Sequence, residues 1–128
     1  MSSFKINKPP NAFDPSKVGT YPAKTYSGGG YFYDEVLEYR VWTKENGEAV
    51  YHAFATYDDA LQFSKNTKNA EKPLVLVQQN SYIAETDDGR VSHVHKQRVA
   101  EWQVEWLDGN RGTLEKIPVF IANAKSSR

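Results

Sequence analysis

Alternation of apolar and polar residues predicts a strand near the end of this chain. In AEWQVEWLDG, residues 100–109, the residues Ala100, Trp102, Val104 and Trp106 alternate with polar ones. Period-two alternation sends successive side chains to opposite faces of a strand, so one face is expected to be buried. We interpret Trp102, Val104 and Trp106 as core residues beside the main helix.

A β-hairpin is expected between residues 31 and 56. The segment 31–43, YFYDEVLEYRVWT, is rich in aromatic and branched residues, and the segment 48–56, EAVYHAFAT, follows Asn46 and Gly47. Asn-Gly between two such segments is typical of a two-residue turn. Both faces of the first strand carry apolar residues, which predicts either cover on both faces or a bulge that shifts its phase.

One main helix is expected after the hairpin. In residues 57–67, YDDALQFSKNT, the apolar positions fall mainly on one side of a helix. Thr56 stands three residues before Asp59, which is the spacing of an N-cap. The pattern therefore predicts a helix that packs one side on the sheet.

Two further segments are expected to add strands. Residues 72–83, KPLVLVQQNSYI, contain an apolar run without alternation, which is typical of a central strand buried on both faces. Residues 90–99, RVSHVHKQRV, lead into the final strand as one long bent strand or as two strands separated near Lys96. After Gly112, a short helix and an edge strand over 118–122 both fit the sequence.

The first part of the chain has a different composition. Four of the six prolines fall in the first 30 residues, which end in three glycines. Such a composition buries little apolar surface, so residues 1–29 are interpreted as a flexible or loosely docked arm. Its scattered aromatic residues leave open that it docks on the domain or on a partner.

These elements predict an α+β fold with one domain over residues 30–124. A mostly antiparallel sheet carries one main helix on a face, and the arm precedes it. The whole chain of 128 residues has the length of a single domain.

Charge and cysteine content limit the possible functions. The 16 basic and 16 acidic residues cancel, so no net field attracts nucleic acid or an anionic membrane. The chain has no cysteine, which excludes a disulfide framework and a thiolate nucleophile. It has no apolar run of membrane-span length and does not start like a signal peptide, so we expect a soluble, cytoplasmic protein.

Histidines are the first candidate site. His93 and His95 are two residues apart, so their rings leave the same face of a strand, and His52 is the only other histidine. Two imidazoles need a third ligand to hold zinc or iron. Because no complete ligand set is visible, no metal is expected, and the two rings are interpreted as part of a solvated strand face.

Carboxylates form the second candidate site. Glu101, Gln103 and Glu105 share one face of the expected strand. Glu101 and Glu105 are candidates for acid and base catalysis, which needs burial that separates their pKa values. Pairing with Arg40 or Arg98 would instead make this row an ordinary charged outer face, which is the preferred interpretation.

The loop after this strand is the third candidate site. Gly109, Asn110, Arg111, Gly112 and Thr113 could aim backbone amides and a guanidinium at a phosphate or carboxylate. Asp108 opposes anion binding there. The loop is nevertheless the best candidate for an anion or cofactor site.

Four segments, YFYDEVLEYRVW, YHAFATYDDALQFSKNT, EKPLVLVQQNSYI and EWQVEWL, resemble short bacterial proteins of the GNAT family of N-acetyltransferases. The resemblance covers about residues 30–121 and is the ground for expecting a bacterial source. It implies acetyl-CoA held by a strand, a glycine-containing loop and a helix N-terminus, and the matching loop here is Gly109 to Thr113. The loop departs from the spacing of the family motif, and Pro118 falls where the helix should run.

Three functions are therefore expected. The first is a domain that binds a small molecule or a protein through its aromatic-rich sheet, without covalent catalysis or a cofactor. The alternative is an acetyl-CoA-dependent N-acetyltransferase. The third is a homodimeric structural subunit joined along an edge strand, so both monomer and homodimer stay open.

Overall fold

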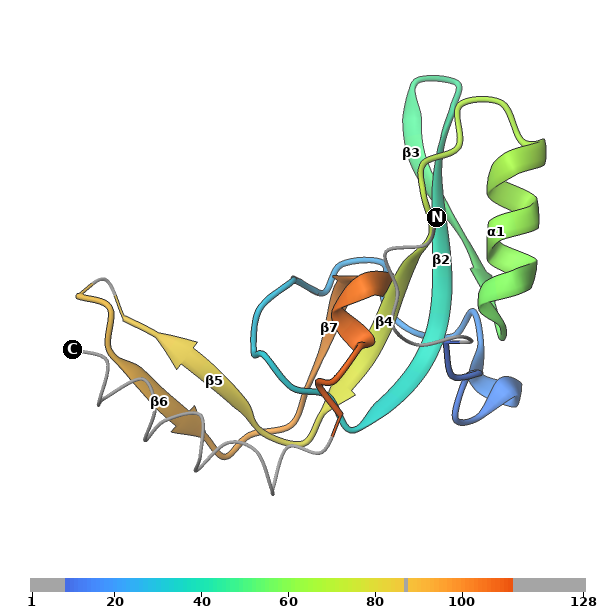
Figure 1. Cartoon of the computed structure of the whole chain (residues 1–128). Helices are drawn as coiled ribbons and strands as arrows, with labels where there is room; N and C mark the ends of the chain where they lie inside the picture. The colour runs from blue at the N-terminus through green and yellow to red at the C-terminus, as the bar shows by residue number, and fades with distance from the viewer. Residues whose placement is uncertain (1–8, 87, 112–128) are drawn as a thin grey trace.

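A computed structural model describes residues 9–86 and 88–111 (Figure 1). Its main sheet has the strand order β1-β7-β4-β2-β3, and β5 and β6 form a second sheet. The elements are the 3-10 helix η1 (Pro15–Lys17), β1 (Tyr26–Ser27), β2 (Glu35–Glu45), β3 (Glu48–Phe54), α1 (Tyr57–Asn66), β4 (Leu74–Gln79), β5 (Tyr82–Glu85), β6 (Val91–Val94), β7 (Arg98–Gln103) and the 3-10 helix η2 (Val104–Leu107). Among the strands of the described residues, only β1 pairs in parallel, with β7. The predicted α+β fold, mostly antiparallel with one α-helix on a face, is confirmed.

The local signals in the sequence form the expected structures. Asn46 and Gly47 have φ angles of 53° and 82° and connect β2 to β3, as a two-residue turn requires. The Thr56 side chain accepts a hydrogen bond of 3.1 Å from the Asp59 amide at the start of α1. In the described part of the chain, no helix has the length and apolar character needed to cross a membrane.

The strand β4 lies in the middle of the main sheet, as predicted, and both of its faces are covered. Tyr39, Val75 and Trp102 are aligned across β2, β4 and β7 on the face that packs against α1 and η2. Glu38 and Glu101 flank Leu76 on the opposite face. The pairing register of β2 with β4 also shifts between Val36 and Glu38. The apolar residues on both faces of β2 are therefore explained both by cover on the two faces and by a bulge.

Residues 9–29 cover this opposite face of the sheet and its ends. The Ala12 amide donates to the Ala55 carbonyl at 2.8 Å, and the Phe13 amide donates to the Val36 carbonyl at 2.7 Å. Further along, Tyr26 pairs with Ala100 in β7. Residues 9–29 are therefore docked on the domain, which is one of the alternatives left open above. Their composition did not indicate this, because the groups that hold them are backbone atoms of the sheet.

The final strand ends earlier than predicted. It stops at Gln103, and Trp106 lies in η2, where it is 40% exposed. The placement of Trp106 in the core was therefore wrong, although Trp102 and Val104 are each only 2% exposed. Successive side chains turn by about 120° in a 3-10 helix rather than alternating, and Leu107 takes the next buried position.

The structure also gives the boundaries of the strands in the second half of the chain. Residues 72–83 divide into β4 and β5, and residues 90–103 form the two strands β6 and β7, as one of the alternatives predicts. The alternatives for the segment after Gly112 lie outside the described residues.

Candidate functional site: an aromatic pocket

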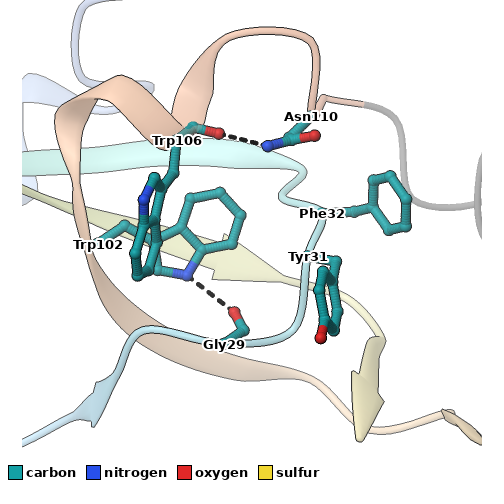
Figure 2. Close-up of a pocket in the computed structure, with 6 residues that line it drawn as sticks. All are labelled: Gly29, Tyr31, Phe32, Trp102, Trp106 and Asn110. Atoms are coloured by element: carbon teal, nitrogen blue, oxygen red, sulfur yellow. Dashed lines mark hydrogen bonds between the residues drawn. The ribbon is translucent and has the colours of Figure 1, made fainter. Parts of the chain in front are cut away.

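A pocket of about 540 Å³ lies where the loop before β2 meets β7 and η2 (Figure 2). Ligand pockets have volumes of roughly 300 to 1,000 Å³. We call it the aromatic pocket, and its lining residues are Gly29, Tyr31, Phe32, Trp102, Trp106 and Asn110. None of these described residues has an acidic or basic side chain, apart from the weakly acidic Tyr31 phenol.

Two indoles form one side of the aromatic pocket. The rings of Trp102 and Trp106 meet edge to face with centroids 6.0 Å apart, and Tyr33 packs on Trp102 at 5.9 Å in the same manner. Figure 2 shows Tyr31 and Phe32 on the other side of the pocket. Edge-to-face contacts stabilise aromatic rings in defined positions, so this wall has a fixed shape.

The loop Gly28–Tyr31 forms the second side and has an unusual backbone. Gly28, Gly29 and Gly30 have φ angles of 70°, 84° and 84°, and Tyr31 follows with 65°. Glycine adopts this left-handed conformation without steric cost, whereas Tyr31 is strained by about 1 to 2 kcal/mol. Gly28 is also required by space, because a Cβ there would lie 2.9 Å from Cζ3 of Trp106.

A buried amide holds this loop in place. The Gln79 side chain donates to the carbonyls of Gly29 at 3.1 Å and Phe32 at 3.0 Å, and it accepts from Arg98 Nε at 2.7 Å. The Trp102 indole N–H donates to the same Gly29 carbonyl at 2.9 Å. Because the loop is tied to both β4 and β7, the aromatic pocket is organised before any ligand arrives.

Replacing Gly30 by Ala is expected to destabilise the protein by at least about 2 kcal/mol. This loss combines the cost of a left-handed alanine with the cost of a clash in a buried position. The new Cβ would lie 2.0 Å from Nε2 of Gln79. Gly47→Ala is the matched control, since Gly47 has a φ of 82° and open space around its Cβ. Denaturant unfolding followed by circular dichroism measures both; equal losses would mean that the Gln79 contact is unimportant.

The predicted anion loop lies beside the aromatic pocket, and two of its side chains already make contacts within the protein. The Asn110 side chain donates to the Trp106 carbonyl at 2.7 Å. Nη2 of Arg111 lies 3.2 Å from a carboxylate oxygen of Glu35. Gly109 has a φ of 76°, and Gly112 and Thr113 lie outside the described residues. Anion binding at this loop stays a prediction.

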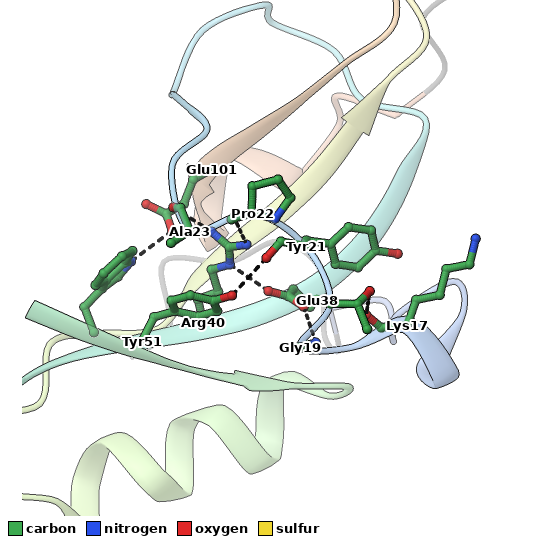
Figure 3. A network of polar contacts seen from close by, with 11 residues as sticks. Lys17, Gly19, Tyr21, Pro22, Ala23, Glu38, Arg40, Tyr51 and Glu101 are labelled. Carbon is green, nitrogen blue, oxygen red and sulfur yellow. Dashed lines mark hydrogen bonds and ion pairs between the residues drawn. The ribbon is translucent and has the colours of Figure 1, made fainter.

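The two candidate catalytic carboxylates lie apart from the aromatic pocket. Glu101 is on the opposite face of β7 from Trp102, where its Oε2 accepts from the Trp42 indole at 2.9 Å and lies 3.6 Å from Arg40 (Figure 3). Glu105 belongs to η2 and is exposed. Glu101 has the expected Arg40 partner, but the outer-face interpretation was wrong for it, because its side chain is only 15% exposed and residues 9–29 cover this face of the sheet. Glu105 does not continue the row, because β7 ends at Gln103. A catalytic role of either residue stays a prediction.

Around Arg40 lies a buried polar network that the sequence analysis did not identify (Figure 3). Arg40 Nε is 2.7 Å from Glu38 Oε2, and its other nitrogens donate to the carbonyls of Pro22 at 2.6 Å and Ala23 at 3.2 Å. The Gly19 amide donates to the second Glu38 oxygen at 2.8 Å. Since each group is satisfied, the network attaches the N-terminal segment to the sheet. The sequence signal for this network was the pair of opposite charges at Glu38 and Arg40, two residues apart in a strand.

The structure does not bring the third histidine to the other two. His93 and His95 stack with ring centroids 4.0 Å apart in and after β6, whereas His52 in β3 lies 2.9 Å from Glu45. Among the described residues, no group of three or more His, Cys, Asp or Glu side chains could hold a metal ion.

His93 is expected to make the stability depend on pH. Burial, and then the neighbouring His95, lower its pKa below the usual value. The unfolded chain then takes up the proton at a higher pH than the folded one, so stability falls as the pH drops below about 6.5 and levels off below the folded pKa. Titration by NMR should show the pKa of His93 rising partly in His95→Ala and unchanged in His52→Ala. A pKa of His93 at or above the usual value in the wild type would contradict this.

The aromatic pocket was missed by the sequence analysis for an identifiable reason. Three of its six lining residues, Gly29, Tyr31 and Phe32, come from the junction between the expected arm and the first strand. The sequence signal for the pocket was a run of glycines followed directly by aromatic residues.

Comparison of the chain with protein-family models, with curated proteins and with solved structures finds no significant match.

Proposed function

We propose that this protein is a non-catalytic binding domain whose aromatic pocket takes an uncharged aromatic or apolar group. The observation that carries the proposal is the lining of the pocket by four aromatic side chains and no charged one among its described residues. Aromatic walls offer a large contact area with few rotatable bonds. The group can belong to a small molecule or to an exposed side chain of a protein, because the recognition chemistry is the same.

Two further features support a binding role. The hydrogen bonds from Gln79 and Trp102 to the Gly29 carbonyl hold the loop in one conformation, and a preformed site loses less entropy on binding. Trp106 and Tyr31 are each 40% exposed, so a ligand can cover them from solvent. Tryptophan and tyrosine are frequent in the residues that dominate binding energy.

No described contact favours the acetyl-CoA alternative. Arg111, the cation of the expected cofactor loop, is paired with Glu35 at 3.2 Å. Acetyl-CoA is therefore tested as a second ligand in the experiment below. The cytoplasmic location and the bacterial source also stay predictions.

Indole is a suitable probe, and the chain contains its own reference signal. Titration with indole is expected to shift the NMR signals of the Trp102 and Trp106 indole N–H groups. Trp42 N–H, which donates to Glu101 on the other face of the sheet, should stay in place. Trp106→Ala should weaken binding about tenfold or more, as loss of a binding hot spot does.

The controls separate the two functions. Phe13→Ala removes a more exposed aromatic side chain that does not line the aromatic pocket, so it should bind indole like the wild type. Equal shifts of all three tryptophans, or none up to the solubility of indole, would overturn the proposal. Acetyl-CoA should leave the melting temperature unchanged, whereas a rise by mass action would support the acetyltransferase alternative.

A further inference from the structure

Within residues 9–86 and 88–111, the outer edge of β3 is the long unpaired edge of the main sheet. β3 is the last strand in the order β1-β7-β4-β2-β3, and β2 is its one partner among the described strands. It has seven residues, whereas β1 at the other edge has two. An edge strand presents a row of backbone N–H and C=O groups to any chain that can pair with it.

The turn fixes which backbone groups of β3 face outward. A two-residue turn makes Glu45 and Glu48 a hydrogen-bonded pair, and such pairs recur at every second position of an antiparallel ladder. Val50 and His52 belong to this series and face β2, since they pair with Thr43 and Val41.

The alternate residues Ala49, Tyr51 and Ala53 therefore direct their backbone groups away from β2. No residue in the ranges 9–86 and 88–111 forms a backbone hydrogen bond with them.

This edge lacks the features that usually prevent pairing. Edges are commonly blocked by proline, by lysine, by a bulge or by a very short strand. After Glu48, the sequence of β3 is AVYHAF, and its register with β2 is regular over all seven residues.

The Tyr51 side chain in the middle of β3 is held in place by contacts within the protein. The Tyr51 hydroxyl donates to the Tyr21 carbonyl at 2.9 Å, and its ring lies 4.4 Å below the Arg40 guanidinium. The edge is therefore a regular strand that needs no rearrangement to pair.

We infer that β3 pairs antiparallel with β3 of a second copy of this chain, about a two-fold axis at Tyr51. In this register, Ala49 lies opposite Ala53 of the second copy, and every outward N–H group meets an outward carbonyl. On the other face Val50 lies opposite His52, so no like charges oppose each other.

The net charge of the chain does not oppose a second copy as the occupant. The 16 basic and 16 acidic residues cancel, so two copies do not repel each other through their net charge. The two main sheets would join into one continuous sheet across the axis, which is an isologous interface.

Amide hydrogen exchange tests this pairing with an internal control. The Ala49, Tyr51 and Ala53 amides should exchange more slowly as the protein concentration rises, while Val50 and His52, which bond to β2, should show no such dependence. Light scattering should give the mass of two chains at the higher concentrations. Slow exchange of the outward amides in a protein that has the mass of one chain would mean that another part of the same chain covers the edge, and this would overturn the inference.

A pair of matched variants locates the interface. Ala49→Lys places a charge on the edge, and Gln62→Lys places the same charge on the exposed side of α1. Ala49→Lys should have the mass of one chain and a melting temperature that no longer rises with protein concentration, and Gln62→Lys should remain a dimer. A monomeric wild type up to its solubility limit, or a dimer that survives Ala49→Lys, would refute pairing through β3. Indole binding should be the same in both variants, so the aromatic pocket is tested independently.

Discussion

Replacing Arg40 by Met is expected to lower the free energy of unfolding by about 3 to 5 kcal/mol, as removal of one member of a buried ion pair does. Arg40 is completely buried, and so is its partner Glu38. Without the guanidinium, the Glu38 charge loses its ion pair, and the carbonyls of Pro22 and Ala23 lose their donors. Urea unfolding followed by circular dichroism measures the loss.

An exposed arginine provides the control for this prediction. Arg111 also contacts a carboxylate, Glu35, but its side chain is 55% exposed, so Arg111→Met should cost less than about 1 kcal/mol. The double variant Glu38→Leu, Arg40→Met should lose less than the sum of its single variants, because no buried charge remains. If Arg40→Met and Arg111→Met lost the same free energy, Arg40 would not be what holds residues 9–29 on the sheet.

Replacing Trp102 by Ala is expected to cost about 3 to 5 kcal/mol, the range for deleting a large buried aromatic side chain. Trp102 contacts Tyr33 and Trp106 and donates to the Gly29 carbonyl, so its loss opens a cavity and releases the loop of the aromatic pocket. Trp106→Ala should cost only about 1 kcal/mol because that side chain is partly exposed. Denaturant unfolding compares the two variants.

The variants Trp102→Ala and Trp106→Ala also separate the effect on stability from the effect on indole binding. Trp106→Ala should weaken indole binding about tenfold or more while it stays folded, whereas Trp102→Ala should lose both stability and binding. Trp102→Phe keeps an aromatic ring and removes the N–H, and it should cost an intermediate amount of free energy. Equal destabilisation by Trp102→Ala and Trp106→Ala would contradict the different burial of the two indoles.

Much of the fold was predictable because its signals are local. Asn46 and Gly47 determine a turn by their backbone preferences, and Thr56 caps a helix through an amide three residues away. The unbroken apolar run of β4 indicated a central strand because only a strand covered on both faces needs such residues. These signals were sufficient for the hairpin, the helix and the class of the fold.

Other features depended on partners that are distant in the sequence. Trp106 continues the alternation of the strand, but the chain turns into η2 after Gln103 and exposes it. Composition indicated a flexible or loosely docked arm, yet residues 9–29 find their hydrogen-bond partners on Arg40, Ala55 and β7. Neither outcome can be read from neighbouring residues.

The candidate site shows the same division. The sequence by itself determined which residues can form a strand, a turn or a helix, and it drew attention to Trp102, Trp106 and the loop from Gly109. Only the tertiary structure brought Tyr31 and Phe32 across from these indoles and tied their loop to Gln79. The physical reason is range: backbone preferences act over a few residues, whereas a pocket is formed by packing between segments about 70 residues apart, as the bond between Gly29 and Trp102 shows.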